Sequence, residues 1–339
     1  MARSTAPIDA RVTSHRLPLT VVALALAGAG GLLVATWAGW SATVAAFGHL
    51  HPGWIAVIVG LAVAGLGGYT LAYGAWARAA GNARPGWSEV ARVVTAGFGP
   101  FAFLGGFALD RRALCELGEE EGRARRLVLG LGALEYAVLA PAAWVAAILL
   151  LAAGSRHVQT ALLWPWVAAV PAGFAIGFWA AARWRRRTRP PGHRLTAMLD
   201  DGFKGFELLR DALRHPIRHA GSWLGMAMYW AAEIGMLVAA ARLFGTTLGA
   251  AHAVLAYATG YSLTRRSMPL AGAGATEISL AFALLWVGLP LATALPIVVA
   301  YRAANLLLPA LPALRHARRP RWWPAMGPRP VAARRLTRR

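Results

Sequence analysis

Four ionisable side chains lie within long apolar stretches of the sequence, where a charge has no water to solvate it: Glu135, Glu233, Glu277 and Arg302. A charge at the centre of a spanning helix costs about 2.5–3.5 kcal/mol, so Arg302 should have an acidic partner. Glu277 and Glu135 are the candidates. Such a pair could lock two helices together, or it could line a polar cavity that receives a lipid headgroup or a proton. The sequence leaves both interpretations open.

The stretch from Pro269 to Glu277 places Gly272 and Gly274 directly before an apolar segment. Glycine adopts backbone conformations that other residues avoid, and the free N–H groups at the start of a helix suit a phosphate. Small residues also let two helices approach closely within a membrane. The stretch therefore predicts either a phosphate-binding turn or a close helix contact.

Membrane-spanning helices must position these residues. Of the 339 residues, 58% are hydrophobic and only 14% are charged, whereas soluble domains carry about 25% charged residues. A spanning helix needs about 20 apolar residues, and the sequence offers several such runs. We therefore predict an all-α integral membrane protein with about eight transmembrane helices. They are expected near residues 17–40, 53–76, 127–153, 160–182, 222–243, 249–263, 271–287 and 291–314.

A ninth apolar segment, from Val93 to Leu109, contains a proline and several glycines, which disfavour a straight spanning helix. If this segment enters the membrane and returns, both termini lie in the cytoplasm, and every Lys and Arg except Arg156, Arg242 and Arg302 falls on the cytoplasmic side. That is the distribution the positive-inside rule expects. We therefore predict one re-entrant segment. Irregular backbone at membrane depth needs protein or a water-filled cavity to satisfy it, so the segment also indicates a cavity.

The chain is expected to have three parts: a cytoplasmic tail at 1–16, a membrane domain at 17–314, and a basic, disordered cytoplasmic tail at 315–339. The membrane domain should carry a basic cytoplasmic linker and an amphipathic helix at about 183–218. The first apolar run lacks a cleavage pattern and is expected to remain as a span. The preference for arginine over lysine, with abundant alanine and glycine, suggests a GC-rich bacterial genome, hence a multi-pass protein of the bacterial cytoplasmic (inner) membrane.

Composition excludes several classes of function. The formal charge of +21 sits in loops between apolar runs, which favours contact with anionic headgroups over nucleic acid. One cysteine, Cys115, excludes an internal disulfide framework. His49 and His51 lack acidic or cysteine partners nearby in the sequence, so no metal is expected, and no phosphate-binding loop of the Walker type is present. No cofactor is predicted.

The C-terminal motifs resemble those of the lysylphosphatidylglycerol synthase transmembrane region, a flippase-like integral membrane family with uncharacterised bacterial and archaeal members. The resemblance rests on Pro269 to Glu277, which is similar to the family's glycine-rich element before a helix, and on the pair Tyr301-Arg302 in the next helix. Three residues depart from the family pattern: Leu270, Ala271 and Tyr136 stand where the family has proline, glycine and arginine.

The first half of the chain resembles the family more weakly. Gly105-Gly106 and the following residues through Arg112 are similar to its glycine–arginine element, and Glu135 stands where the family has an acidic residue. The resemblance, which extends over about 17–314, implies that the protein moves or handles a lipid. The side chains expected to bind that lipid are Gly105, Gly106, Arg112, Glu135, Gly272, Gly274, Glu277, Tyr301 and Arg302.

The predicted function is that of a lipid translocase, or a lipid-binding transporter, for an anionic or modified phospholipid or a lipid-linked intermediate. Family members fused to a soluble aminoacyl-transferase domain make aminoacylated phosphatidylglycerol. Here the longest soluble segment, 183–218, is too short for that chemistry. Two alternatives stay open. The protein could be a non-catalytic subunit that recruits a separate glycosyl- or aminoacyl-transferase, or a membrane-embedded transferase using one of its few cytoplasmic-side aspartates, such as Asp110, Asp200 or Asp201.

Overall fold

All regular elements in the described part of the chain are helices. This computed structural model describes residues 16–48, 50–82, 84–99, 102, 105–155, 158–186, 194–261 and 268–315. Residues 1–15 and 316–339 of the predicted tails, and Arg156 and His49, lie outside these ranges. The elements are α2 (Arg16–Ala38), α3 (Trp40–Ala46), α4 (Gly53–Ala80), α5 (Trp87–Gly97), α6 (Gly106–Glu116), α7 (Glu121–Ala152), α8 (Thr160–Arg185), α9 (Arg194–Arg214), α10 (Ala220–Leu243), α11 (Ala250–Gly260), η1 (Pro269–Gly272), α12 (Ala275–Trp286) and α13 (Leu291–Arg315).

Seven stretches among the described residues are long and apolar enough to cross a membrane. They are α2, α4, α7, α8, α10, α13 and the stretch Pro269–Trp286 that joins η1 to α12. Their outward faces carry exposed large apolar side chains, such as Leu32, Val63 and Ile176, which suit a hydrocarbon surrounding and not water. The prediction of an all-helical, multi-pass membrane protein is confirmed at this level.

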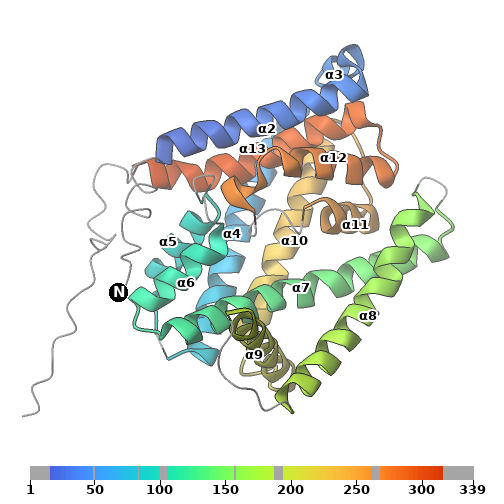
Figure 1. The fold of residues 1–339 in the computed structure, drawn as a ribbon. Helices are drawn as coiled ribbons and strands as arrows, with labels where there is room; N and C mark the ends of the chain where they lie inside the picture. The colour runs from blue at the N-terminus through green and yellow to red at the C-terminus, as the bar shows by residue number, and fades with distance from the viewer. Residues whose placement is uncertain are drawn as a thin grey trace, which may run out of the picture.

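Hydrogen bonds between the ends of neighbouring helices define two ends of the bundle. At the first, Arg123 and Arg218, at the starts of α7 and α10, donate to the carbonyls of Ala80 and Ala79 at the end of α4. At the second, the N–H of His51, just before α4, donates to the carbonyl of Leu243 at the end of α10 (2.8 Å). We call the first the basic end and the second the far end. Figure 1 shows α4 and α10 side by side between them.

Two helical hairpins enter the bundle from opposite ends. α5 and α6 start and finish at the basic end, near the end of α4. α11 follows α10 at the far end, and α12 returns there, since the N–H of Gln159 at the start of α8 donates to the carbonyl of Trp286 (3.0 Å). α11 has 11 residues and α12 has 12, so each rises about 16–18 Å, roughly half of the 30 Å that a crossing needs.

Of the two spans predicted at 249–263 and 271–287, the second coincides with the apolar stretch Pro269–Trp286, whereas the first corresponds to α11, which has only 11 residues. The first of these runs ends as a helix at Gly260, and the second begins with η1, in which Leu270 and Ala271 have non-helical, left-handed backbone angles. Apolar composition alone does not reveal whether a helix crosses the membrane or turns back within it.

Glycines and tryptophans hold the long helices together. A side chain at Gly225 would come within 2.6 Å of the carbonyl oxygen of Gly68, so α10 and α4 touch through their backbones. Small residues allow this kind of close helix packing within a membrane. In α8, Pro171 cannot donate to the carbonyl of Val167, and the indole of Trp144 on α7 donates to it instead (3.1 Å).

Candidate functional site

The two hairpins meet tip to tip. The N–H of Leu270, in η1, donates to the carbonyl of Ala102, in the irregular segment between α5 and α6 (3.3 Å). Gly105 closes that segment with a left-handed φ of 80°, and Gly106 begins α6. We call this junction the tip contact. The interruption predicted from Val93 to Leu109 is therefore real, and it faces a second interruption that sequence analysis treated as a glycine-rich turn.

The backbone of the second tip is strained. Leu270 and Ala271 both have φ of 54°, and Gly272 and Gly274 follow with φ of 67° and 86°. Glycine adopts such angles freely, whereas a residue with a side chain pays about 1–3 kcal/mol. Ala271 thus bears a left-handed conformation that glycine would accept without strain. Strain of this kind persists only where surrounding contacts hold it in place.

Arg302 supplies one of those contacts and pairs with Glu277. Its Nε donates to Oε1 of Glu277 (2.7 Å), and its Nη2 donates to the carbonyl of Ala271 (3.1 Å). The other carboxylate oxygen of Glu277 accepts the N–H of Gly274 (2.6 Å), which caps α12. Both side chains are only 3% exposed. Of the two partners proposed for Arg302, the structure shows Glu277.

The α2 helix covers the tip. A side chain at Gly30 would lie 2.6 Å from the carbonyl oxygen of Gly274 and 3.0 Å from its Cα. Because these are backbone atoms, an added side chain at Gly30 could be accommodated only by shifting the backbone of one of the two segments. Two residues earlier along the chain, an added side chain at Gly28 would meet no atom within 4 Å. The close-contact interpretation of the glycine-rich stretch is therefore correct for Gly274, through a helix that the sequence did not associate with it.

Glu135 lies apart from this pair. Its Oε1 accepts the hydroxyl of Tyr69 (2.5 Å), and its backbone carbonyl accepts the indole N–H of Trp230 (2.9 Å). The pairing of Glu135 with Arg302, one of the two options from sequence, is wrong. Charge complementarity could not choose between the two glutamates, because that choice depends on which helices are neighbours.

Tyr301 and Arg302 are adjacent in sequence but bind different carboxylates. The hydroxyl of Tyr301 donates to Oε2 of Glu233 (2.5 Å), and the same oxygen accepts the hydroxyl of Tyr257 and the amide of Asn305, both at 3.2 Å. We call these four residues the Glu233 cluster. Sequence analysis noted Glu233 but did not place it with Tyr301, and it missed Tyr257 and Asn305. The signal available was the spacing of Asn305, one turn after Tyr301 on the same face.

Arg112 lies on the surface of the first hairpin. Its Nε is 3.4 Å from Oε1 of Glu116, one turn further along α6, and its side chain is 30% exposed. Helix rise places it about 9 Å from Gly106, towards the basic end. The structure thus brings Gly272, Gly274, Glu277 and Arg302 together at the tip contact with the first hairpin, and places Arg112 outside that group.

Two of the aspartates considered for a transferase, Asp200 and Asp201, are engaged in ion pairs at the basic end, and the third, Asp110, is buried in α6. Asp201 lies 2.8 Å from Arg125, and Asp200 lies 2.5 Å from Lys204, whose hydrogen bond lowers the pKa of Asp200. Within the ranges described, no group of three or more His, Cys, Asp and Glu residues could hold a metal ion. The Arg125–Asp201 pair joins α9 to α7, whereas the Asp200–Lys204 pair lies within α9.

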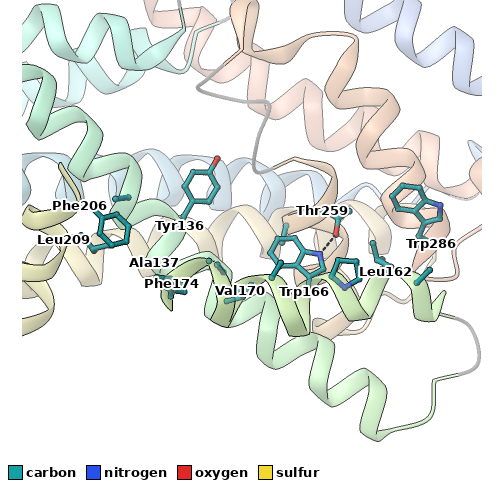
Figure 2. Close-up of a pocket in the computed structure, with 17 residues that line it drawn as sticks. Tyr136, Ala137, Leu162, Trp166, Val170, Phe174, Phe206, Leu209, Thr259 and Trp286 are labelled. Atoms are coloured by element: carbon teal, nitrogen blue, oxygen red, sulfur yellow. Dashed lines mark hydrogen bonds between the residues drawn. The ribbon is translucent and has the colours of Figure 1, made fainter. Parts of the chain in front are cut away.

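A cavity of about 790 Å³ opens elsewhere, between α7 and α8. Figure 2 shows its aromatic and aliphatic lining, with the indole of Trp166 donating to the hydroxyl of Thr259 (2.9 Å). None of the residues predicted to bind substrate lines it. Glu277 and Arg302, around which a cavity was expected, are instead buried against each other. We call the observed space the α7/α8 cavity.

No protein-family model matches the sequence, and no curated protein matches it.

Proposed function

We propose that the protein is a lipid translocase, or a lipid-binding transporter, for a lipid with an anionic headgroup. The observation that carries this proposal is the Glu277–Arg302 pair, buried among apolar helices at the point where two interrupted hairpins meet. Ionisable residues at membrane depth are expensive and mark pathways for ions, protons or substrates in membrane proteins. Interrupted helices that meet near the midplane are a common way to build such a binding site.

The proposed orientation follows from charge. Among the described residues, the basic end carries the arginines that flank the helices, including Arg78, Arg123, Arg183 and Arg218, and Arg242 lies at the far end. The positive-inside rule then assigns the basic end to the cytoplasm, in the bacterial inner membrane. Six long helices cross, and each hairpin enters from its own side. Both termini are then cytoplasmic, as the sequence predicted with a different number of crossings.

The pair itself suggests a mechanism. A guanidinium matches a phosphate as well as a carboxylate, through two parallel hydrogen bonds. A lipid phosphate that reached Arg302 would compete with Glu277 for it, and a proton on Glu277 would weaken the carboxylate in that competition. The strained turn at Leu270 and Ala271 would then lose its contact with Arg302 and could separate from the first hairpin. The closed pair is the resting state in this scheme.

Lipid scrambling in proteoliposomes tests the proposal. Vesicles would contain phosphatidylglycerol or phosphatidylcholine labelled on the headgroup, and loss of label to a reductant added outside would report movement between leaflets. We expect wild type to accelerate movement of the anionic lipid, and Glu277→Gln and Arg302→Gln to abolish this while remaining folded. The exposed pair Arg111–Glu121 (3.5 Å) offers a control: Glu121→Gln should leave scrambling unchanged.

Two results would count against it. If no lipid moved faster with wild type than in empty vesicles, translocation would be refuted and a subunit that recruits a separate transferase through its basic end would be favoured. If scrambling survived both Gln variants, the pair would be a structural lock and the lipid path would lie elsewhere.

A further inference from the structure

We infer that the α7/α8 cavity binds an acyl chain of an anionic phospholipid whose headgroup lies at the basic end. The inference deepens the proposed function, on which its role in transport rests. It names a site for the apolar part of the lipid, remote from the pair that would engage the phosphate. The occupant is a single lipid held by the protein, as distinct from the lipids that surround every span.

The lining suits hydrocarbon and little else. α7 and α8 contribute mostly alanine, glycine and aromatic side chains, and Phe206 of α9 and Trp286 of α12 lie towards opposite ends (Figure 2). Thr259, one of the few polar side chains there, already binds Trp166 and the carbonyl of Leu255. An apolar cavity of this kind does not hold ordered water, and its volume falls within the roughly 300–1,000 Å³ of ligand pockets.

Packing does not explain why the cavity is open. Gly177 on α8 is small because Phe206 lies against it, 3.0 Å from where a side chain would begin. Gly173, one turn earlier and also lining the cavity, would meet no atom within 4 Å if it carried a side chain. Contact with a neighbouring helix therefore does not require a glycine at position 173, where a larger residue would fit and would fill the cavity.

The position of the cavity makes a lipid the natural occupant. It lies between α7 and α8, two of the helices that are apolar enough to span a membrane. Of the seven such stretches, α8 is the least covered by the rest of the protein, with only 11% of its apolar segment buried. Hydrocarbon, not water, therefore borders it. Its lining on α8 runs from Ala161 to Phe174, a rise of about 20 Å, which exceeds the roughly 15 Å thickness of one leaflet.

Charge at one end indicates which headgroup is bound. Beyond Phe174, α8 continues about 16 Å towards the basic end and finishes at Arg185, next to Arg183 and Arg186, both exposed. The neighbouring Arg125 and Lys204 are already paired with aspartates. Exposed arginines in the last turn of an apolar helix attract anionic headgroups, so a lipid with its chain in the cavity would place a phosphate near positive charge.

Photolabelling in nanodiscs tests the inference. The probe is phosphatidylglycerol with a diazirine near the end of one acyl chain, in bilayers of phosphatidylcholine and phosphatidylglycerol, with adducts mapped by mass spectrometry. We expect adducts on the lining segments 133–140 and 161–174. Gly173→Phe should lower them about tenfold, equal to about 1.4 kcal/mol of lost binding, whereas Ala172→Phe, on the exposed neighbour that does not line the cavity, should leave them unchanged. Thermal melting of both variants checks that they fold.

Equal labelling in the two variants, or adducts spread evenly over outward-facing positions, would mean surrounding lipid only and would overturn the site. Equal labelling by a phosphatidylcholine probe would overturn the preference for an anionic headgroup. Cavity labelling by a wild-type protein that scrambles no lipid would leave this inference standing and refute the translocase. If Gly173→Phe lost the labelling but still scrambled lipid at the wild-type rate, the cavity would bind lipid without being part of the transport path.

Discussion

Removing one charge of the Glu277–Arg302 pair should destabilise the protein more than removing both. Glu277→Gln removes the charge while preserving shape, but its single amide oxygen can accept only one of the two hydrogen bonds that the carboxylate oxygens accept from the N–H of Gly274 and the Nε–H of Arg302. Arg302 would then be an uncompensated charge in a site that is 3% exposed. Breaking a buried pair in this way costs about 3–5 kcal/mol, and a lone charge at mid-membrane costs about 2.5–3.5 kcal/mol. We expect a loss of about 3 kcal/mol.

The double variant Glu277→Gln/Arg302→Gln removes both charges and leaves two amides that can bind each other. It should lose less free energy of unfolding than either single variant, because no charge stays buried. The assay is unfolding in bicelles, followed by steric trapping or denaturant titration. The exposed control Glu121→Gln should change stability by no more than about 1 kcal/mol. Additive losses in the double variant would refute the coupling inferred from the 2.7 Å contact.

Three further perturbations follow from contacts described above. Gly30→Ala should lower the free energy of unfolding by about 1–3 kcal/mol, because the new side chain would collide with the backbone of Gly274. Gly28→Ala should be neutral or slightly stabilising. Equal effects of the two variants on the melting temperature would contradict the packing of α2 on the tip. Trp144→Phe should cost about 0.5–1.5 kcal/mol, and should cost less in a Pro171→Ala background, where the helix supplies its own N–H donor; an unchanged cost in this double-mutant cycle would count against the indole bond. Lowering the pH should destabilise wild type more than His219→Gln, as measured by the difference in their melting temperatures.

The direction of the pH effect follows from the surroundings of His219, at the start of α10. Its ring is buried against Trp76 (5.5 Å), and Nε2 lies 3.3 Å from Asp211. Burial lowers its pKa despite the opposing effect of Asp211, while Arg218 lowers it further. The unfolded chain therefore takes up the proton first, so stability falls as pH drops below about 6.5, the ordinary value.

Asp211 shifts stability in the same direction at lower pH. Burial alone would raise its pKa, but hydrogen bonds from His219 and His215 lower it. The stability that it contributes is present above its ordinary value, near 4, and is lost as pH falls through the lowered one. The exposed His215 serves as the matched control. If His215→Gln flattened the melting curve between pH 7 and 5 as much as His219→Gln, burial would not be the cause.

Some of this structure could be predicted from the sequence. Apolar runs of about 20 residues identify candidate spanning helices because hydrocarbon demands that length, and the seven long apolar stretches of the structure were all predicted in this way. The partner of Arg302 could be narrowed to two glutamates for the same reason. The broken segment before α6 could be recognised because proline and glycine disfavour a helix there, whatever its neighbours.

The rest depended on which helices are neighbours. An apolar run such as α11 looks like a span until its end at Gly260 is known. Tyr301 and Arg302 look like one motif, but consecutive residues on a helix point about 100° apart, and these two therefore reach different carboxylates. The α7/α8 cavity is space left by small residues on two helices, and no single stretch of sequence shows that the space is unfilled.

The most direct test of the account is to lock the tip contact and ask whether lipid still moves. In a Cys115→Ala background, Ala102→Cys and Leu270→Cys would place two thiols on residues whose backbones already hydrogen-bond (3.3 Å), a spacing compatible with a disulfide. We predict that oxidation stops scrambling of labelled phosphatidylglycerol and that a reductant restores it, while each single cysteine variant is unaffected by either treatment. Scrambling at an unchanged rate, with the disulfide shown by mass spectrometry to be complete, would contradict the claim that the hairpins must separate to pass a lipid.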